Sequence, residues 1–231
     1  IIPDLVDSRQ SKYGAARIPL RIWSAACSTG QEVYSIAMTL LEMLPDRNKY
    51  DITILGTDIS DQAIAQASYG KYNSFEVERG LPQAVRNRYF TPMGGSWRIK
   101  DEIRSMANFS KLNLMKPFPD FGPFDMVFCR NVAIYFSQND KGRLFKKIAR
   151  ILEPDGALIV GGSETLGGIA PDFRAQQYLR GIFYQLQSFV SKGAAVLKKE
   201  APQKTVPPRP RRKTVYDKPR SVSKKIEKAP V

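Results

Sequence analysis

The chain has 231 residues, with 36 Lys and Arg against 22 Asp and Glu and no histidine, so its formal net charge is +14 at pH 7. With 42% apolar and 25% charged residues it has the composition of a globular protein, and no apolar run approaches the roughly 20 residues that cross a membrane. The lack of histidine excludes a Ser-His-Asp triad, a Cys-His pair and His-ligated zinc. Two cysteines, Cys27 and Cys129, cannot form a four-ligand metal site or a disulfide framework. We therefore expect no metal site and a reducing compartment.

The positive charge is concentrated in the last forty residues. Residues 192–231 contain 13 Lys and Arg, 3 Asp and Glu, and six of the 16 prolines, whereas the rest of the chain has a net charge of only +4. Such a segment cannot bury enough apolar surface to offset the entropy lost on ordering. The sequence therefore predicts a disordered, basic, Pro-rich tail over 191–231, which is either a linker or an arm for an anionic partner.

Two patterns alternate along the chain. Short apolar runs, each ended by turn residues, are typical of buried strands, and stretches with apolar residues every three or four positions are typical of helices. In the first turn, Ser28 followed by Gln31 resembles a capping box. The alternation predicts a parallel sheet covered on both faces. In chain order the predicted elements are strand 20–26, helix 33–44, strand 52–58, a short helix begun by Ser60 and Asp61, strands 109–113 and 124–129, a helix capped by Ser137, a turn over 154–156, and strands 157–160 and 181–187.

Residues 69–107 do not show this alternation of strand and helix patterns. They contain one helical stretch, 81–90, and two strand-like stretches, 97–100 and 102–106, which predict an inserted subdomain with a small antiparallel hairpin. The last strand, 181–187, follows no clear helix, so we expect it to be an antiparallel edge strand. The predicted fold class is α/β, a Rossmann-like sandwich with a seven-stranded, mostly parallel sheet and a small inserted antiparallel β-subdomain.

In such sheets, ligands bind outside the carboxyl ends of the strands. The turn at 25–32 is rich in small residues but has neither a dinucleotide-binding nor a P-loop pattern. Asp58, after the second strand, suits a pair of ribose hydroxyls, and Asn113 and Leu114 suit the edge and face of an adenine. A polar and aromatic loop, 130–136, follows the next strand. Together these features suit S-adenosylmethionine, whose single sulfonium charge needs no phosphate cradle.

Each of these features also has a structural interpretation. Asp58 is equally well placed to cap a helix, and Tyr135 and Phe136 have the character of core aromatics. Asp125 reads as a structural acid. The two cysteines read as small buried apolar residues, to which we assign no reactive role.

Six short motifs stand out along the chain. They are 23–32 (Trp-Ser-Ala-Ala-Cys-Ser-Thr-Gly-Gln-Glu), 56–60 (Gly-Thr-Asp-Ile-Ser), 113–114 (Asn-Leu), 128–136 (Phe-Cys-Arg-Asn-Val-Ala-Ile-Tyr-Phe), 154–156 (Pro-Asp-Gly) and 162–164 (Gly-Ser-Glu). Together they resemble the motifs of the CheR-type chemoreceptor glutamate methyltransferases, over about residues 20–187. The resemblance implies transfer of a methyl group from S-adenosylmethionine to the side-chain carboxylates of receptor glutamates, giving methyl esters and S-adenosylhomocysteine.

The resemblance also assigns roles to residues. Tyr135 would lie beside the transferring methyl group. Two further roles are hypotheses from the chemistry: the hydroxyl of Tyr135 would orient the substrate carboxylate, and Arg130 is a cation that would help attract it. A glutamate carboxylate is already ionised at neutral pH, so the chemistry needs no general base and no metal. The expected cofactor-binding residues are Ala25, Gly30, Glu32, Asp58, Asn113, Leu114, Arg130 and Asn131.

The resemblance divides the chain into regions. Residues 20–190 would be the methyltransferase domain, with 69–107 as its inserted β-subdomain, and 1–19 would be the end of an N-terminal helical domain or a linker. The expected partner is the cytoplasmic domain of chemotaxis receptors, with its acidic helical methylation sites, and in some family members the β-subdomain docks a receptor tail peptide. We expect a cytoplasmic monomer with no nucleic-acid partner.

The chain departs from the family pattern in three places. An Asn-Glu-Thr-x-Phe-Phe-Arg-like motif is not found, Gln31 replaces the more usual Glu, and Ala133 replaces a bulkier Met or Leu. One alternative is a non-catalytic S-adenosylmethionine-binding scaffold. A nucleic-acid methyltransferase is disfavoured, because residues 130–133 differ from the Asn/Asp-Pro-Pro-Tyr/Phe loop of base methylation and the +4 of the folded part makes a poor nucleic-acid groove.

Overall fold

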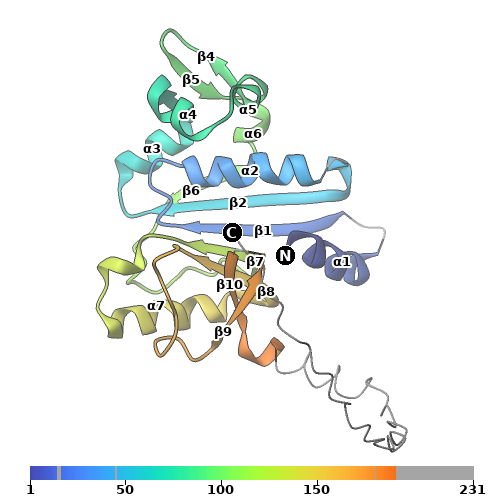
Figure 1. Ribbon diagram of the computed structural model, residues 1–231, viewed down its shortest axis with the longest axis vertical. Coiled ribbons are helices and arrows are strands. Elements are labelled where there is room, and N and C mark those ends of the chain that lie inside the picture. Colours follow the sequence, from blue (N-terminus) through green and yellow to red (C-terminus); the bar gives the residue numbers. More distant parts are fainter. Residues whose placement is uncertain (15–16, 45, 180, 191–231) are drawn as a thin grey trace, which may run out of the picture.

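A seven-stranded sheet forms the centre of the molecule, with the strand order β6-β2-β1-β7-β8-β10-β9 (Figure 1). The structure, a computed structural model, describes residues 1–14, 17–44, 46–179 and 181–190. The first five strands in that order pair in parallel, and β10 runs antiparallel to both of its neighbours. The strands of this sheet are β1 (Ile18–Ala25), β2 (Tyr50–Asp58), β6 (Ala107–Lys111), β7 (Phe124–Cys129), β8 (Leu152–Val160), β9 (Phe173–Tyr178) and β10 (Gly181–Leu186).

Helices cover both faces of the sheet. On β1, Ile18, Leu20 and Ile22 pack into one apolar core together with residues of α1 and α2, whereas Trp23 and Ala25 pack into a second core with residues of α7. Successive strand side chains point to opposite faces, so the two cores lie on opposite sides of the sheet. The helices are α1 (Ile2–Tyr13), α2 (Gln31–Met43), α3 (Asp61–Tyr69), α4 (Ser74–Gly80), α5 (Gln83–Tyr89), α6 (Asp101–Arg104) and α7 (Gln138–Arg150), with short 3-10 helices η1 (Arg47–Lys49) and η2 (Ala133–Tyr135).

The strand order reverses between β1 and β7. The chain passes from β1 outward to β2 and β6, then crosses back to β7 on the other side of β1. This topology confirms the predicted Rossmann-like class, and it places the switch point, where ligands bind in such sheets, at the carboxyl ends of β1 and β7. In the part of the chain that the structure describes, no helix is both long and apolar enough to cross a membrane.

The inserted segment forms its own small antiparallel sheet, β3-β5-β4, at the top of Figure 1. Its strands are β3 (Lys71–Asn73), β4 (Phe90–Pro92) and β5 (Ser96–Ile99). The helix expected within 81–90 is confirmed as α5, but the strand expected at 102–106 is wrong, because this stretch belongs largely to α6. Asp101 in the first turn of α6 favours a helix and lies 3.0 Å from Arg104, and Ile103 is fully buried.

Three further expectations are wrong. The capping box is not formed, because Gly30 is the N-cap of α2 and makes no side-chain cap. The turn expected at 154–156 lies within β8, as an irregularity in its register with β7. The last strand, β10, is antiparallel as predicted, but it is not at the edge, because β9 pairs along its outer side.

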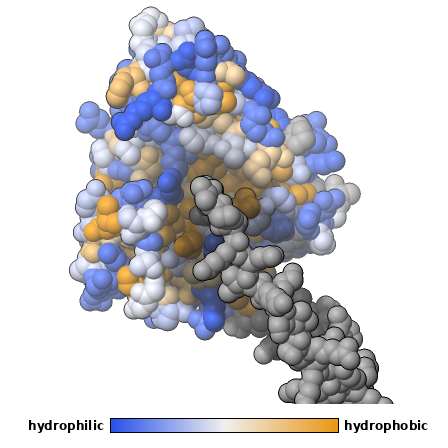
Figure 2. Space-filling view, in the orientation of Figure 1, coloured by the Kyte–Doolittle hydropathy of each residue, from blue (hydrophilic) through white to orange (hydrophobic). Residues whose placement is uncertain are grey.

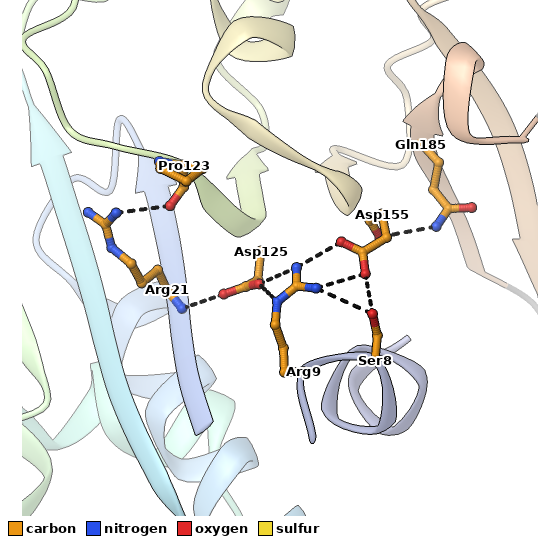
Figure 3. A network of polar contacts seen from close by, with 7 residues as sticks. All are labelled: Ser8, Arg9, Arg21, Pro123, Asp125, Asp155 and Gln185. Atoms are coloured by element: carbon orange, nitrogen blue, oxygen red, sulfur yellow. Dashed lines mark hydrogen bonds and ion pairs between the residues drawn. The ribbon is translucent and has the colours of Figure 1, made fainter. Parts of the chain in front are cut away.

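Residues 1–19 contain helix α1, which is attached to the sheet by a buried arginine (Figure 3). Arg9 is 4% exposed, and its guanidinium donates to Asp125 at 2.7 Å and to both oxygens of Asp155 at 2.8 Å. Asp125 also accepts the backbone N–H of Arg21 at 2.7 Å. Burial alone would lower the pKa of Arg9, but the hydrogen bonds and charges of both carboxylates raise it above its ordinary value. Asp125 is therefore structural, as predicted, while the predicted tail at 191–231 lies outside the described residues.

Candidate functional site

The turn after β1 has an unusual backbone. Ala26, Ser28 and Gly30 all have positive φ angles, of 58°, 51° and 91°. A β-carbon at Gly30 would lie 2.8 Å from the β-carbon of Ala67, so this position also needs glycine for close packing. Left-handed non-glycine residues cost about 1 kcal/mol or more and cluster at functional sites. Two such residues, Ala26 and Ser28, lie in this turn at the switch point of the sheet, which makes the turn a candidate functional site.

Asp58 ends β2 beside this turn. One of its carboxylate oxygens accepts the backbone N–H of Ser28 at 2.9 Å, and the other accepts that of Ser60 at 3.0 Å. The N-cap of α3 is Ser60, whose hydroxyl accepts the N–H of Ala63. Asp58 is therefore not the capping residue, and each of its oxygens keeps lone-pair capacity for a ligand hydroxyl.

Glu32 connects α2 to the loop after β7. Its carboxylate accepts the hydroxyl of Ser24 at 2.8 Å and the guanidinium of Arg130 at 2.9 Å. Glu32 lies in the first turn of α2, where the helix dipole favours a negative charge. Arg130, whose side chain is 45% exposed, is thus already paired with one carboxylate at the switch point.

The next residue, Asn131, also has a left-handed backbone, with φ of 58°. Its backbone N–H donates to a carboxylate oxygen of Glu164, which lies in the loop after β8, at 2.8 Å. The sequence places Glu164 in the motif 162–164 but predicts no role for its side chain. Its spacing of 33 residues from Asn131 carries no signal that would reveal the contact.

Asn113 and Leu114 follow β6. The side-chain oxygen of Asn113 accepts the N–H of Met115 at 2.8 Å, which closes a local turn, and Leu114 is buried in the apolar core that contains α7. The N–H of Leu112 donates to the carbonyl of Asp58 at 2.8 Å, which fixes this loop beside the end of β2. The loop is thus at the expected edge, while its contact with an adenine remains a prediction.

Tyr135 lies at the end of η2 and is 80% exposed. Phe136 is half-buried against the core, so the structural interpretation fits Phe136 but not Tyr135. Among the described residues, no hydrogen bond joins the Tyr135 side chain to another predicted site residue. The Tyr135 side chain is therefore exposed to solvent, on the loop that also carries Arg130.

Two open pockets share Phe128, in β7, and Arg130, the first residue after it. One, of about 640 Å³, is largely apolar and extends from Glu32 along α2 to the start of α1. The other, of about 660 Å³, extends past Glu164 to the first residues of β10. Apolar surface gathers near the middle of the face shown in Figure 2. Asp58 and Asn113 line neither of these two pockets.

The two cysteines are free and buried. Burial, with the nearby charge of Asp58, raises the pKa of Cys27 to about 12. Burial likewise raises the pKa of Cys129 well above its usual range. Neither thiol is available as a thiolate at neutral pH, in agreement with the absence of a reactive role.

The fold and the residues at its switch point define a class, the Rossmann-like methyltransferase domain. The model of the family described as CheR methyltransferase, SAM binding domain, matches residues 2–181. The chain belongs to this family, and the matched region is its S-adenosylmethionine-binding domain.

Relatives from several bacteria agree with this assignment. Chemotaxis protein methyltransferase Cher2 of Pseudomonas putida is 42% identical over 172 residues, which cover 72% of this chain and 62% of that protein. Chemotaxis protein methyltransferase 1 of Vibrio cholerae is 38% identical over 186 residues, covering 79% of this chain and 68% of that protein. A TehB-like SAM-dependent methyltransferase from Corynebacterium glutamicum superposes with a TM-score of 0.46 at 13% identity, covering 78% of this chain and 87% of that chain. The chain thus spans about two thirds of the length of the curated relatives, and the assignment rests on the sequence matches.

Proposed function

We propose that this protein methylates the side-chain carboxylates of glutamates in chemotaxis receptors, giving glutamyl methyl esters. The observation that carries the proposal is the loop after β7, which begins with Arg130, paired with Glu32 at the switch point, and also carries the exposed Tyr135. The relatives' names, chemotaxis protein methyltransferase, support the same activity.

The residues at the strand ends fit S-adenosylmethionine. Asp58 would accept the ribose hydroxyls with the lone pairs that Ser28 and Ser60 leave, since a carboxylate has about four acceptor positions. The turn at Ala25 and Gly30 would let the backbone approach the ligand closely. The remaining contacts would come from Glu32, Asn113, Leu114, Arg130 and Asn131.

When bound, S-adenosylmethionine supplies a methyl group that leaves its sulfonium sulfur for a carboxylate oxygen, so no proton has to move. The protein's task is therefore to align the acceptor and exclude water. Arg130 would attract the glutamate carboxylate while Glu32 holds the guanidinium in place. Tyr135 would orient that carboxylate through its hydroxyl.

The substrate class suggests where the protein acts and with what. We propose that it works as a monomer in the cytoplasm, on the acidic helical methylation sites of a receptor's cytoplasmic domain. The three-stranded sheet of the insertion is a candidate site for a receptor tail peptide. The basic residues at 192–231 are a candidate arm for an anionic partner.

Transfer of label to methanol tests the activity. The protein is incubated with methyl-labelled S-adenosylmethionine and a receptor cytoplasmic fragment, and the product is treated with mild alkali. A glutamyl ester releases volatile labelled methanol, and a fragment whose acceptor glutamates are replaced by alanine should release none. Cofactor binding without volatile label would contradict the proposal and favour a scaffold, and label that resists alkali would indicate N-methylation.

A further inference from the structure

One carboxylate oxygen joins the loops after β7 and β8. Cys129 and Val160 are paired at the ends of these two strands. Just beyond them, the N–H of Asn131 and the N–H of Gly161 donate to the same Oε2 atom of Glu164, at 2.8 Å and 2.6 Å. The N–H of Glu164 in turn donates to the carbonyl of Gly161 at 2.9 Å. The side chain therefore closes its own loop and holds the neighbouring loop with one atom.

The contact with Asn131 holds a left-handed backbone. Asn131 has a φ of 58°, a conformation that asparagine tolerates better than other side-chain-bearing residues and that contacts around it fix in place. The pairing of β7 with β8 ends at Cys129, so the N–H of Asn131 needs an acceptor outside the sheet. Glu164 provides that acceptor and so holds the peptide between Arg130 and Asn131 at the point where the chain bends.

Gly161 is the position that makes the contact possible. A β-carbon there would lie 2.6 Å from Oε2 of Glu164 and 3.1 Å from the backbone nitrogen of Asn131. The φ angle of Gly161 is not in the left-handed region, so the requirement for glycine is close approach and not backbone freedom. Gly162, the next residue, has nothing within 4 Å of its hypothetical β-carbon.

Fold stability alone explains this side chain poorly. The other oxygen of Glu164, Oε1, is buried and has no hydrogen-bond partner in the described part of the chain. No cation pairs with Glu164 among these residues, and Arg130 is paired with Glu32. A buried carboxylate oxygen without a partner is unfavourable, so its retention indicates a requirement of the site.

From this geometry we propose that Glu164 is a positioning residue for methyl transfer. It acts through the backbone of Asn131, fixing the loop that carries Arg130, Asn131 and Tyr135 relative to the ends of β7 and β8. It need not touch the cofactor or the acceptor. The inference rests on the proposed methyltransferase activity.

Substitutions at Glu164 test the role of the acceptor atom. Glu164→Ala removes it and should lower kcat at least tenfold and weaken S-adenosylmethionine binding several-fold, measured per folded protein by calorimetry and by methanol release. Glu164→Gln keeps an acceptor oxygen of the same reach and should remain within about threefold of the wild type on both measures. A merely structural residue would lower the melting temperature without changing kcat of the folded protein, and that result would overturn the inference.

The two glycines provide a second test, which also serves if Glu164→Ala does not fold. Gly161→Ala should reproduce the loss of kcat, because its methyl group displaces the carboxylate, whereas Gly162→Ala should behave as the wild type. The double variant Gly161→Ala, Glu164→Ala should be no worse than either single variant, since both break one contact. Additive losses of kcat in the double variant would contradict the proposed role of the contact between Glu164 and Asn131. An inactive wild type would instead count against the proposed function, so the two failures are distinguishable.

Discussion

At the scale of single residues, position after a strand is informative because parallel strands bring their carboxyl ends to one edge. This rule predicts from the sequence alone that Asp58, Asn113 and Arg130 lie at one edge of the sheet, and in the structure they end or directly follow β2, β6 and β7. Their contacts with a ligand stay predictions. The partners of these side chains were not predictable. The Glu32–Arg130 pair joins residues 98 positions apart, and no local pattern encodes such a contact.

The exposure of Tyr135 distinguishes between a packing role and a role at the site. From the sequence alone, an aromatic in this loop is more often a core residue than a catalytic one, but an 80% exposed side chain contributes little to packing. Its hydroxyl is therefore the part of the residue that an acceptor would meet.

Replacing Tyr135 with phenylalanine tests that role. Tyr135→Phe should lower kcat for methyl transfer about tenfold, because one orienting hydrogen bond contributes roughly 1–1.5 kcal/mol, while the Kd for S-adenosylmethionine changes less than twofold. Tyr13→Phe, which removes a hydroxyl from the surface of α1, is the matched control and should leave both unchanged. An unaltered kcat in Tyr135→Phe would remove the residue from the mechanism.

At the scale of elements, long periodic segments were predictable and short ones were not. Helices α2 and α7 carry an apolar stripe over thirteen residues each, so their periodicity is unambiguous. Over four or five residues, the apolar spacing of a helix cannot be told from that of a strand. For this reason the sequence predicts a strand at 102–106, where the structure has α6. Strand β9 has no strand signal in the sequence because it is mostly exposed and polar, with a single buried residue, Phe173.

The attachment of α1 depends on a network with a pH dependence of known sign. Burial alone would raise the pKa of Asp155, but the hydrogen bonds from Arg9 and Ser8 and the charge of Arg9 lower it below its ordinary value. A carboxylate of this kind stabilises the fold above its unfolded pKa, near 4, and loses its contribution as the pH falls through the lower folded value.

Asp155→Asn should therefore lower the free energy of unfolding at pH 7 by about 1–3 kcal/mol, and the difference from the wild type should shrink as the pH falls from 5 to 2. Urea unfolding followed by circular dichroism at several pH values measures this. Asp7→Asn, an equal change of charge on the exposed side of α1, should have little effect at any pH. A difference that is independent of pH would show that the ion pair with Arg9 is not its source.

At the scale of the whole molecule, the +14 charge divides into +4 on residues 1–191 and +10 on residues 192–231, a division that the sequence shows directly. The inserted subdomain was also predictable, from the loss of alternation between residues 69 and 107. Its attachment to the rest of the domain was not, since it depends on contacts between residues far apart in the sequence. Tyr72 of β3 donates its hydroxyl to the carbonyl of Thr29, in the turn after β1, at 2.8 Å. At the other end of α2, Tyr89 donates its hydroxyl to Glu42.

Tyr72 contacts the turn after β1, whereas Tyr89 contacts the far end of α2. Substituting each one therefore separates the subdomain's effect on stability from its effect on that turn. Tyr72→Phe leaves the Thr29 carbonyl without its donor and should weaken S-adenosylmethionine binding about threefold to tenfold, together with a loss of about 1 kcal/mol in the free energy of unfolding. Tyr89→Phe should cost similar stability but leave the Kd for the cofactor unchanged, because its partner is on α2, far along the helix from the turn. Calorimetric titration with S-adenosylmethionine and urea unfolding of both variants measure the two effects. Equal changes in cofactor affinity would mean that the subdomain acts on the site only through overall stability, whereas a change confined to Tyr72→Phe would make the subdomain a direct support of the turn.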